Sequence, residues 1–198
     1  KSVLGSSYTQ KGRSGFRGKG SCLLHRKGEK QMQPLELYIH IPFCVKKCAY
    51  CDFLSGPAGE KEKEEYVKML VDEIRNCPDT VQNYRVISIF FGGGTPSLLT
   101  GEQIGRLMDT VREIFTLDED AEITMEMNPG TVTEEKLRKY RQAGVNRLSI
   151  GLQSVNDEEL RLLGRIHTYE EFLEAADTDL FEKYKLLGKK LDSATGAE

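Results

Sequence analysis

The sequence lacks any long hydrophobic run. None of its apolar stretches approaches the roughly 20 residues that a membrane-spanning helix needs, and no basic-then-apolar leader with a small-residue cleavage site opens it. Of its 198 residues, 38% are hydrophobic and 30% are charged. These proportions are typical of a globular protein of one domain or slightly more. We therefore expect a cytoplasmic protein without a membrane span.

Basic residues are scarce in most of the chain. Residues 1–31 hold eight Lys and Arg and a single acid, Glu29. Subtracting these from the totals of 28 basic and 31 acidic residues leaves 20 and 30 in residues 32–198, a formal charge of −10. A phosphate backbone is bound by clustered Lys and Arg. We therefore expect no nucleic-acid partner.

The basic segment 1–31 has no helical or strand period and contains six Gly. Such a composition buries too little apolar surface to fold alone, so it predicts a disordered tail. The alternative is a segment foreign to the natural protein, because Met32 stands immediately before the first strand-like residues. In that case Lys27–Lys30 would be encoded by a purine-rich ribosome-binding sequence.

Cysteine is used sparingly, yet three of the five fall within eight residues. Cys44, Cys48 and Cys51 have the spacing C-x3-C-x2-C, whereas Cys22 and Cys77 lie apart. An odd, clustered set argues for metal binding over disulfides. Three thiolates suit a [4Fe–4S] cubane with one iron left open. The alternatives are buried free thiols, or a structural zinc site, for which a fourth ligand at zinc-like spacing is missing.

Strand-like and helix-like segments alternate from Leu35 onward. The expected strands are 35–41, 86–91, 122–127 and 146–150. The expected helices are 60–77, 100–115 and 133–144, followed by two that open at Asn156 and Thr168. This alternation predicts an α/β fold with a parallel sheet. Because ligands bind beyond the carboxyl ends of such strands, the loops after the four strands are the ones to search.

A glycine-rich loop follows the second expected strand. Gly92, Gly93 and Gly94 precede Thr95 and Pro96. Glycines allow a ligand to approach the backbone, whose N–H groups are free to donate. An ordinary tight turn explains the same residues equally well. The spacing does not match a dinucleotide fingerprint, and no P-loop lysine follows.

Four strings together carry a family resemblance. The strings YIHIPFC-x3-C-x2-C-x-F, GGGTP, E-x-NP and GLQS resemble the radical S-adenosylmethionine (SAM) proteins related to oxygen-independent coproporphyrinogen III oxidase, and most nearly the HemW-type heme chaperones of that group. The resemblance covers about residues 35–172. It implies a (β/α) radical SAM partial barrel of parallel strands, incomplete here with about four of six βα units. It also implies a [4Fe–4S] cluster on the three cysteines, with SAM on the open iron.

The resemblance further implies a SAM site in or beside the four strand-end loops. Its members are Tyr38, Tyr50, Gly93, Gly94, Thr95, Glu126, Gln153 and Arg165. Each has a simpler interpretation: the tyrosines could pack, the glycines could form an ordinary turn, and the polar residues could be exposed or cap helices. In such proteins, a reduced cluster passes one electron to SAM and yields a 5′-deoxyadenosyl radical.

The sequence departs from the family pattern in two places. In the pattern that the oxidases of the family resemble, C-x3-C-x2-C-x-C, a fourth cysteine stands at the position of Phe53. We therefore rank a heme chaperone above a coproporphyrinogen oxidase and leave open whether the chain is an enzyme. The resemblance fades after about Ala175, which predicts a truncated core over 32–176 and a divergent helix-prone tail over 177–198. Heme or porphyrinogen would contact a missing carboxyl-terminal region. A nonfunctional fragment is therefore the third hypothesis.

Overall fold

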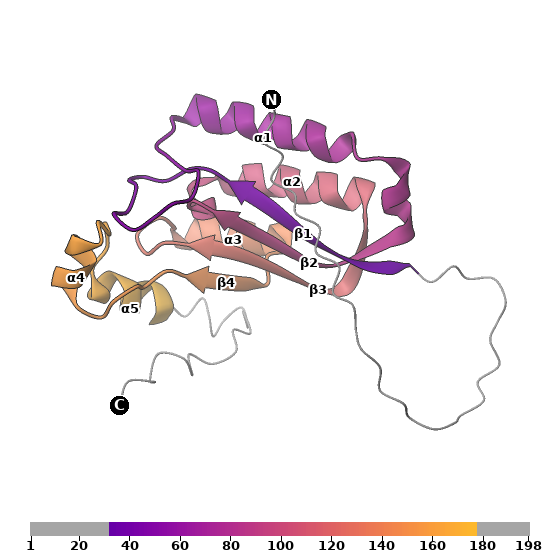
Figure 1. Ribbon diagram of the computed structural model, residues 1–198. Coiled ribbons are helices and arrows are strands. Elements are labelled where there is room, and N and C mark those ends of the chain that lie inside the picture. Colours follow the sequence, from indigo (N-terminus) through magenta and orange to yellow (C-terminus); the bar gives the residue numbers. More distant parts are fainter. Residues whose placement is uncertain (1–31, 178–198) are drawn as a thin grey trace, which may run out of the picture.

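A computed structural model describes residues 32–177 (Figure 1). The expectations for the basic segment 1–31 and for the tail beyond Asp177 lie outside the described residues. One four-stranded sheet has all neighbours parallel, in the order β1-β2-β3-β4, as the predicted α/β fold requires. Its strands are β1 (Gln33–Ile41), β2 (Tyr84–Gly93), β3 (Thr116–Met127) and β4 (Arg147–Ile150).

Helices cover one face of the sheet and extend past the end of β4. The helices are α1 (Glu60–Arg75), α2 (Gly101–Ile114), α3 (Glu134–Ala143), α4 (Asp157–Leu162) and α5 (Tyr169–Asp177), with short 3₁₀ turns η1 (Asp79–Asn83) and η2 (Pro96–Leu98). In Figure 1, α1 lies above the sheet and α2 and α3 lie behind it, whereas α4 and α5 lie beyond the arrowhead of β4. Within residues 32–177, no helix combines the length and the apolar character that crossing a membrane requires.

The helix ends follow the chemistry of their capping residues. Thr100 accepts from Gln103 N, and Gln103 Oε1 accepts from Thr100 N, so the predicted capping box opens α2. Thr133 accepts from Lys136 N and opens α3, which ends at Gly144 with φ of 109°. These predicted ends are confirmed, and they fix where the chain returns to the sheet.

Two expected boundaries are wrong. Helix α1 ends at Arg75, so Cys77 lies outside it and donates its N–H to Ile74 O in a turn. Strand β3 begins at Thr116, six residues before its expected start. Its first two residues, Thr116 and Leu117, pair with Arg85 and Val86 of β2 before the register shifts at Ser88 and Glu122. Backbone groups are satisfied by a neighbouring strand whatever the side chains are.

The core lies between the sheet and the helices. Side chains along β1, β2 and β3 point alternately toward the helices and away from them. Nine hydrophobic side chains of these strands are at most 7% exposed: Ile39, Ile41, Val86, Ile89, Phe91, Ala121, Ile123, Met125 and Met127. Opposite them, α2 contributes Ile104, Leu107, Met108 and Val111, all fully buried. This packing anchors the carboxyl ends of β1, β2 and β3 side by side, which is where the predicted motifs lie.

Tyr140 ties α3 to the segment that follows the glycine loop. Its buried hydroxyl lies 3.1 Å from Ser97 O and 2.5 Å from Leu99 O, and burial raises its pKa, which keeps it protonated as a donor. Tyr140→Phe leaves buried carbonyls without this donor, so we expect it to lower the free energy of unfolding by about 1–3 kcal/mol. Urea denaturation measures the change. Tyr169→Phe, at a half-buried ring, is the control, and equal small effects of both substitutions would contradict the expectation.

Candidate functional site

The loop between β1 and α1 carries the three clustered cysteines. Its two ends are closed by backbone hydrogen bonds from Cys44 N to Gly56 O (2.9 Å) and from Gly56 N to Pro42 O (3.0 Å). Its middle is tied to the end of α4 by a bond from Ala49 N to Leu163 O (3.0 Å). The loop is therefore held at both its base and its tip.

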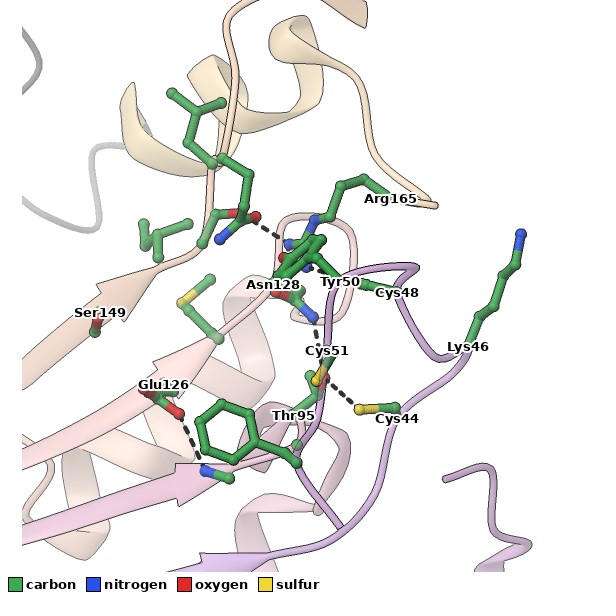
Figure 2. A pocket seen from close by; sticks show the side chains of 18 residues that line it. Cys44, Lys46, Cys48, Tyr50, Cys51, Thr95, Glu126, Asn128, Ser149 and Arg165 are labelled. Atoms are coloured by element: carbon green, nitrogen blue, oxygen red, sulfur yellow. Dashed lines mark hydrogen bonds between the residues drawn. The ribbon is translucent and has the colours of Figure 1, made fainter. Parts of the chain in front are cut away.

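The three thiols line one cavity of about 360 Å³ (Figure 2). Cys44, Cys48 and Cys51 are half-buried and free of disulfides. Thr95 Oγ1 lies 3.8 Å from Cys44 Sγ, and Arg165 Nη1 lies 3.6 Å from Cys48 Sγ. In the described part of the chain, no three His, Cys, Asp or Glu side chains gather closely enough to hold a single metal ion. A cubane takes one thiolate at each of several separate irons, so ligands spread around a cavity suit it.

The glycine loop forms the adjacent wall. Gly93 has φ of 114°, a conformation that favours glycine. Gly94 N donates to Ile41 O (2.8 Å) and Thr95 N donates to Phe43 O (2.6 Å), so the loop is bonded to the chain entering the cysteine loop. The first two motifs of the sequence are thus one connected structure.

Glu126 lies at the end of β3 and faces the same cavity. Its Oε2 accepts from Gly93 N at 3.1 Å, as Figure 2 shows. Burial raises the pKa of Glu126, against the lowering effects of the Gly93 N–H and of His40. One carboxylate oxygen is fixed by the glycine loop, which orients the group for a ligand donor.

Arg165, between α4 and α5, enters the cavity from the opposite side. Its Nη2 donates to Asn128 Oδ1 (2.6 Å), to Gly151 O (2.9 Å) and to His167 Nδ1 (3.4 Å). His167 Nε2 lies 3.3 Å from Leu152 O, and burial, followed by the charge of Arg165, lowers the pKa of His167. A neutral imidazole that accepts from Arg165 fits both contacts.

One donor of Arg165 remains unused. Among the described residues, its Nε is the one buried side-chain nitrogen or oxygen that has no hydrogen-bond partner. A buried guanidinium nitrogen without a partner is costly, and a shift of the guanidinium toward a carboxylate in the cavity would relieve that cost. SAM carries such a carboxylate on its methionine moiety, so this donor fits the cofactor that the motifs imply.

Ten of the eleven residues predicted for the site line this cavity. They are Tyr50, Gly93, Gly94, Thr95, Glu126, Gln153, Arg165 and the three cysteines. Gln153 has φ of 69°, the one positive value outside glycine among the described residues, and such strain clusters at ligand sites. Tyr38 does not line it: its ring stacks on Phe90, and its hydroxyl lies 3.3 Å from His40 Nδ1.

Eight further residues line the cavity, and the sequence predicts no site role for two polar ones among them, Asn128 and Ser149. Asn128 belongs to the E-x-NP string and directly follows β3. Its place at a strand end was a usable signal, because polar residues there face the ligand side of a parallel sheet. Ser149 had no such signal, since it lies inside the short strand β4.

Comparison with known protein families agrees with this geometry. A model of the Radical SAM superfamily matches residues 38–178. The chain belongs to the radical SAM superfamily. Among its relatives, the radical SAM protein named heme chaperone HemW of Escherichia coli (strain K12) is 50% identical over 147 residues, which is 74% of this chain and 39% of that protein. The HemW of Haemophilus influenzae is 42% identical over 71% of this chain and 38% of its own length.

A solved radical SAM structure is similar in fold. Coproporphyrinogen III oxidase (HemN) from Escherichia coli superposes with a TM-score of 0.68 and 32% identity, over 81% of this chain and 36% of that one. The chain thus spans about two fifths of the length of the HemW proteins it matches and about a third of the oxidase.

Proposed function

We propose that this radical SAM chain is the cluster- and SAM-binding portion of a heme chaperone. The observation that carries the proposal is the cavity that joins three free thiols to Arg165, whose Nε has no partner. Cys44, Cys48 and Cys51 would hold a [4Fe–4S] cluster, and Arg165 would pair with the carboxylate of SAM. Together, the cluster and SAM supply one-electron chemistry when bound.

The other lining residues would orient SAM. Glu126 and the backbone of Gly93, Gly94 and Thr95 offer acceptors and donors at the strand ends. Gln153 and Tyr50 would complete the polar wall. Tyr38, on β1, would support the site through its contact with His40. We place the protein in the cytoplasm, a reducing compartment that keeps thiols available for a cluster.

The choice between chaperone and oxidase rests on Phe53 and on the relatives. Phe53 lines the cavity mouth and is 60% exposed, at the position where the sequence pattern of the oxidases has a further cysteine. The two HemW proteins share 50% and 42% identity with the chain, against 32% for the oxidase. Oxidation of a porphyrinogen remains the second candidate function, because the fold is shared with that enzyme.

A hybrid protein tests the proposal. Residues 33–175 would replace the matching part of the Escherichia coli heme chaperone, which supplies the remaining length. We expect the reconstituted hybrid to bind heme in a titration followed by absorbance, and to leave coproporphyrinogen III unchanged. Turnover of coproporphyrinogen III would overturn the chaperone in favour of the oxidase. If the unmodified chaperone bound heme and the hybrid did not, residues 33–175 would not be equivalent to the part of the chaperone that they replace, and the proposal would be contradicted.

A further inference from the structure

A chain of hydrogen bonds joins two of the three cysteine thiols through a single amide. Cys44 Sγ is 3.8 Å from Thr95 Oγ1, which lies 3.0 Å from Asn128 Nδ2. On the other side of the amide, Asn128 Oδ1 lies 2.6 Å from Arg165 Nη2, and Arg165 Nη1 lies 3.6 Å from Cys48 Sγ. Figure 2 shows Asn128 between Arg165 and Thr95. We call these five residues the thiol arc.

The direction of every bond in the thiol arc is fixed by Arg165. A guanidinium only donates, so the atom of Asn128 that faces it must be the amide oxygen. The amide nitrogen therefore faces Thr95 and donates to its hydroxyl oxygen. Since Thr95 accepts this bond, its single hydrogen is free to point at Cys44 Sγ. Both ends of the arc thus present donors to sulfur.

The surroundings keep the thiol arc in place. Thr95 is 2% exposed, and its backbone N–H is bonded to Phe43 O. A Cβ on Gly151 would lie 3.1 Å from Asn128 Oδ1 and 3.3 Å from Arg165 Nη2, so a glycine there leaves room for the pair. Buried networks of this kind rigidify a site when every member is satisfied.

We propose that Asn128 is a positioning residue that sets the reduction potential of the cluster by aiming Thr95 at Cys44 and Arg165 at Cys48. This inference rests on the proposed cluster at the three cysteines. Donors to cluster sulfurs stabilise the extra negative charge of the reduced form and raise the potential. The thiol arc therefore makes a cluster bound here easier to reduce, and Asn128 governs both of its ends.

Asn128→Asp separates the two ends of the thiol arc. An aspartate still accepts from Arg165, so the contact with Cys48 remains. It cannot donate to Thr95, so the threonine hydroxyl turns from Cys44 Sγ toward the new carboxylate. Thr95→Val removes the same bond to sulfur directly, and Thr95→Ser retains a hydroxyl for it. Asn128→Asp and Thr95→Val therefore both remove the hydrogen bond from Thr95 to Cys44 Sγ.

The experiment is a double-mutant cycle on the midpoint potential of the reconstituted protein, followed by EPR in a redox titration. We expect Thr95→Val to lower the reduced-to-oxidised ratio at a fixed potential about tenfold, which is about 59 mV for one electron. Thr95→Ser should restore most of it. Asn128→Asp should lower the potential further, because it also adds a negative charge. In a protein that already carries Thr95→Val, the shift caused by Asn128→Asp should be smaller, and the difference should equal the shift caused by Thr95→Val alone.

Additive shifts of the two substitutions, or a serine variant no better than the valine one, would overturn the proposal. A SAM-binding role of Asn128 alone would leave the potential without SAM unchanged, which also overturns it. Cluster-free protein separates this inference from the proposed function. Unfolding free energies of the same four cluster-free proteins should be non-additive even if no cluster forms. Additive values there would show that the thiol arc itself is absent.

Discussion

Replacing Cys44, Cys48 or Cys51 with serine is expected to remove most of the iron from the protein after anaerobic reconstitution. All three sulfurs line the cavity, and each is the thiolate that one iron of a cubane would need. Loss of a ligand should lower bound iron at least about tenfold, because mutating even a residue that only hydrogen-bonds to a metal ligand lowers metal affinity by that much. Iron and sulfide analysis of the purified variants measures the loss.

Cys77→Ser is the matched control for these substitutions. Cys77 lies after α1, outside the cavity lining, and burial raises the pKa of its thiol. It should keep iron at the level of the unsubstituted chain. Equal iron loss in all four variants would mean that the effect is general unfolding, and full iron retention without Cys44, Cys48 or Cys51 would contradict the cluster assignment.

Gly94→Ala is expected to have the largest effect on stability. A Cβ at this position would lie 2.5 Å from Phe43 O and 3.0 Å from Ile41 O. These carbonyls accept from Thr95 N and Gly94 N and cannot withdraw without breaking both bonds. We expect the substitution to lower the free energy of unfolding by about 3 kcal/mol or more, because overpacking against backbone has no cheap relief. Urea denaturation followed by circular dichroism measures it.

Gly105→Ala gives the opposite expectation on the same chain. Gly105 lies within α2, and a Cβ there would meet nothing within 4 Å. Alanine in a helix interior should raise the stability by roughly 0.5–1 kcal/mol. If Gly94→Ala proved as harmless as Gly105→Ala, the tight contact between the glycine loop and the cysteine loop would be wrong.

The main lines of the fold could be predicted because they depend on local chemistry. Each helix end is satisfied by residues that lie within a few positions of it: Thr100 with Gln103, Thr133, and Gly144. These ends can therefore be predicted from the sequence. The start of β3 could not be predicted in this way. Its residues 116–121 are mostly polar, and the first two of them, Thr116 and Leu117, pair with Arg85 and Val86 of β2.

The candidate site divides in the same way. Cysteine spacing and the glycine run are local patterns, and the cavity brings them together where the parallel sheet requires. The link from Arg165 to Cys48 spans 117 residues, so no local pattern announces it. The position of Asn128 directly after β3 is a local signal for a site residue, but its bonds to Thr95 and Arg165, which come from two other segments, could not be predicted from it.

The most direct test of the account is EPR of the reduced, anaerobically reconstituted chain with and without SAM. We expect a [4Fe–4S] signal that changes when SAM is added, because the three thiols and Arg165 line one cavity. A cluster signal that ignores SAM would contradict the SAM site at Arg165 and Glu126. No cluster signal in a folded chain would contradict the central claim that Cys44, Cys48 and Cys51 hold a [4Fe–4S] centre.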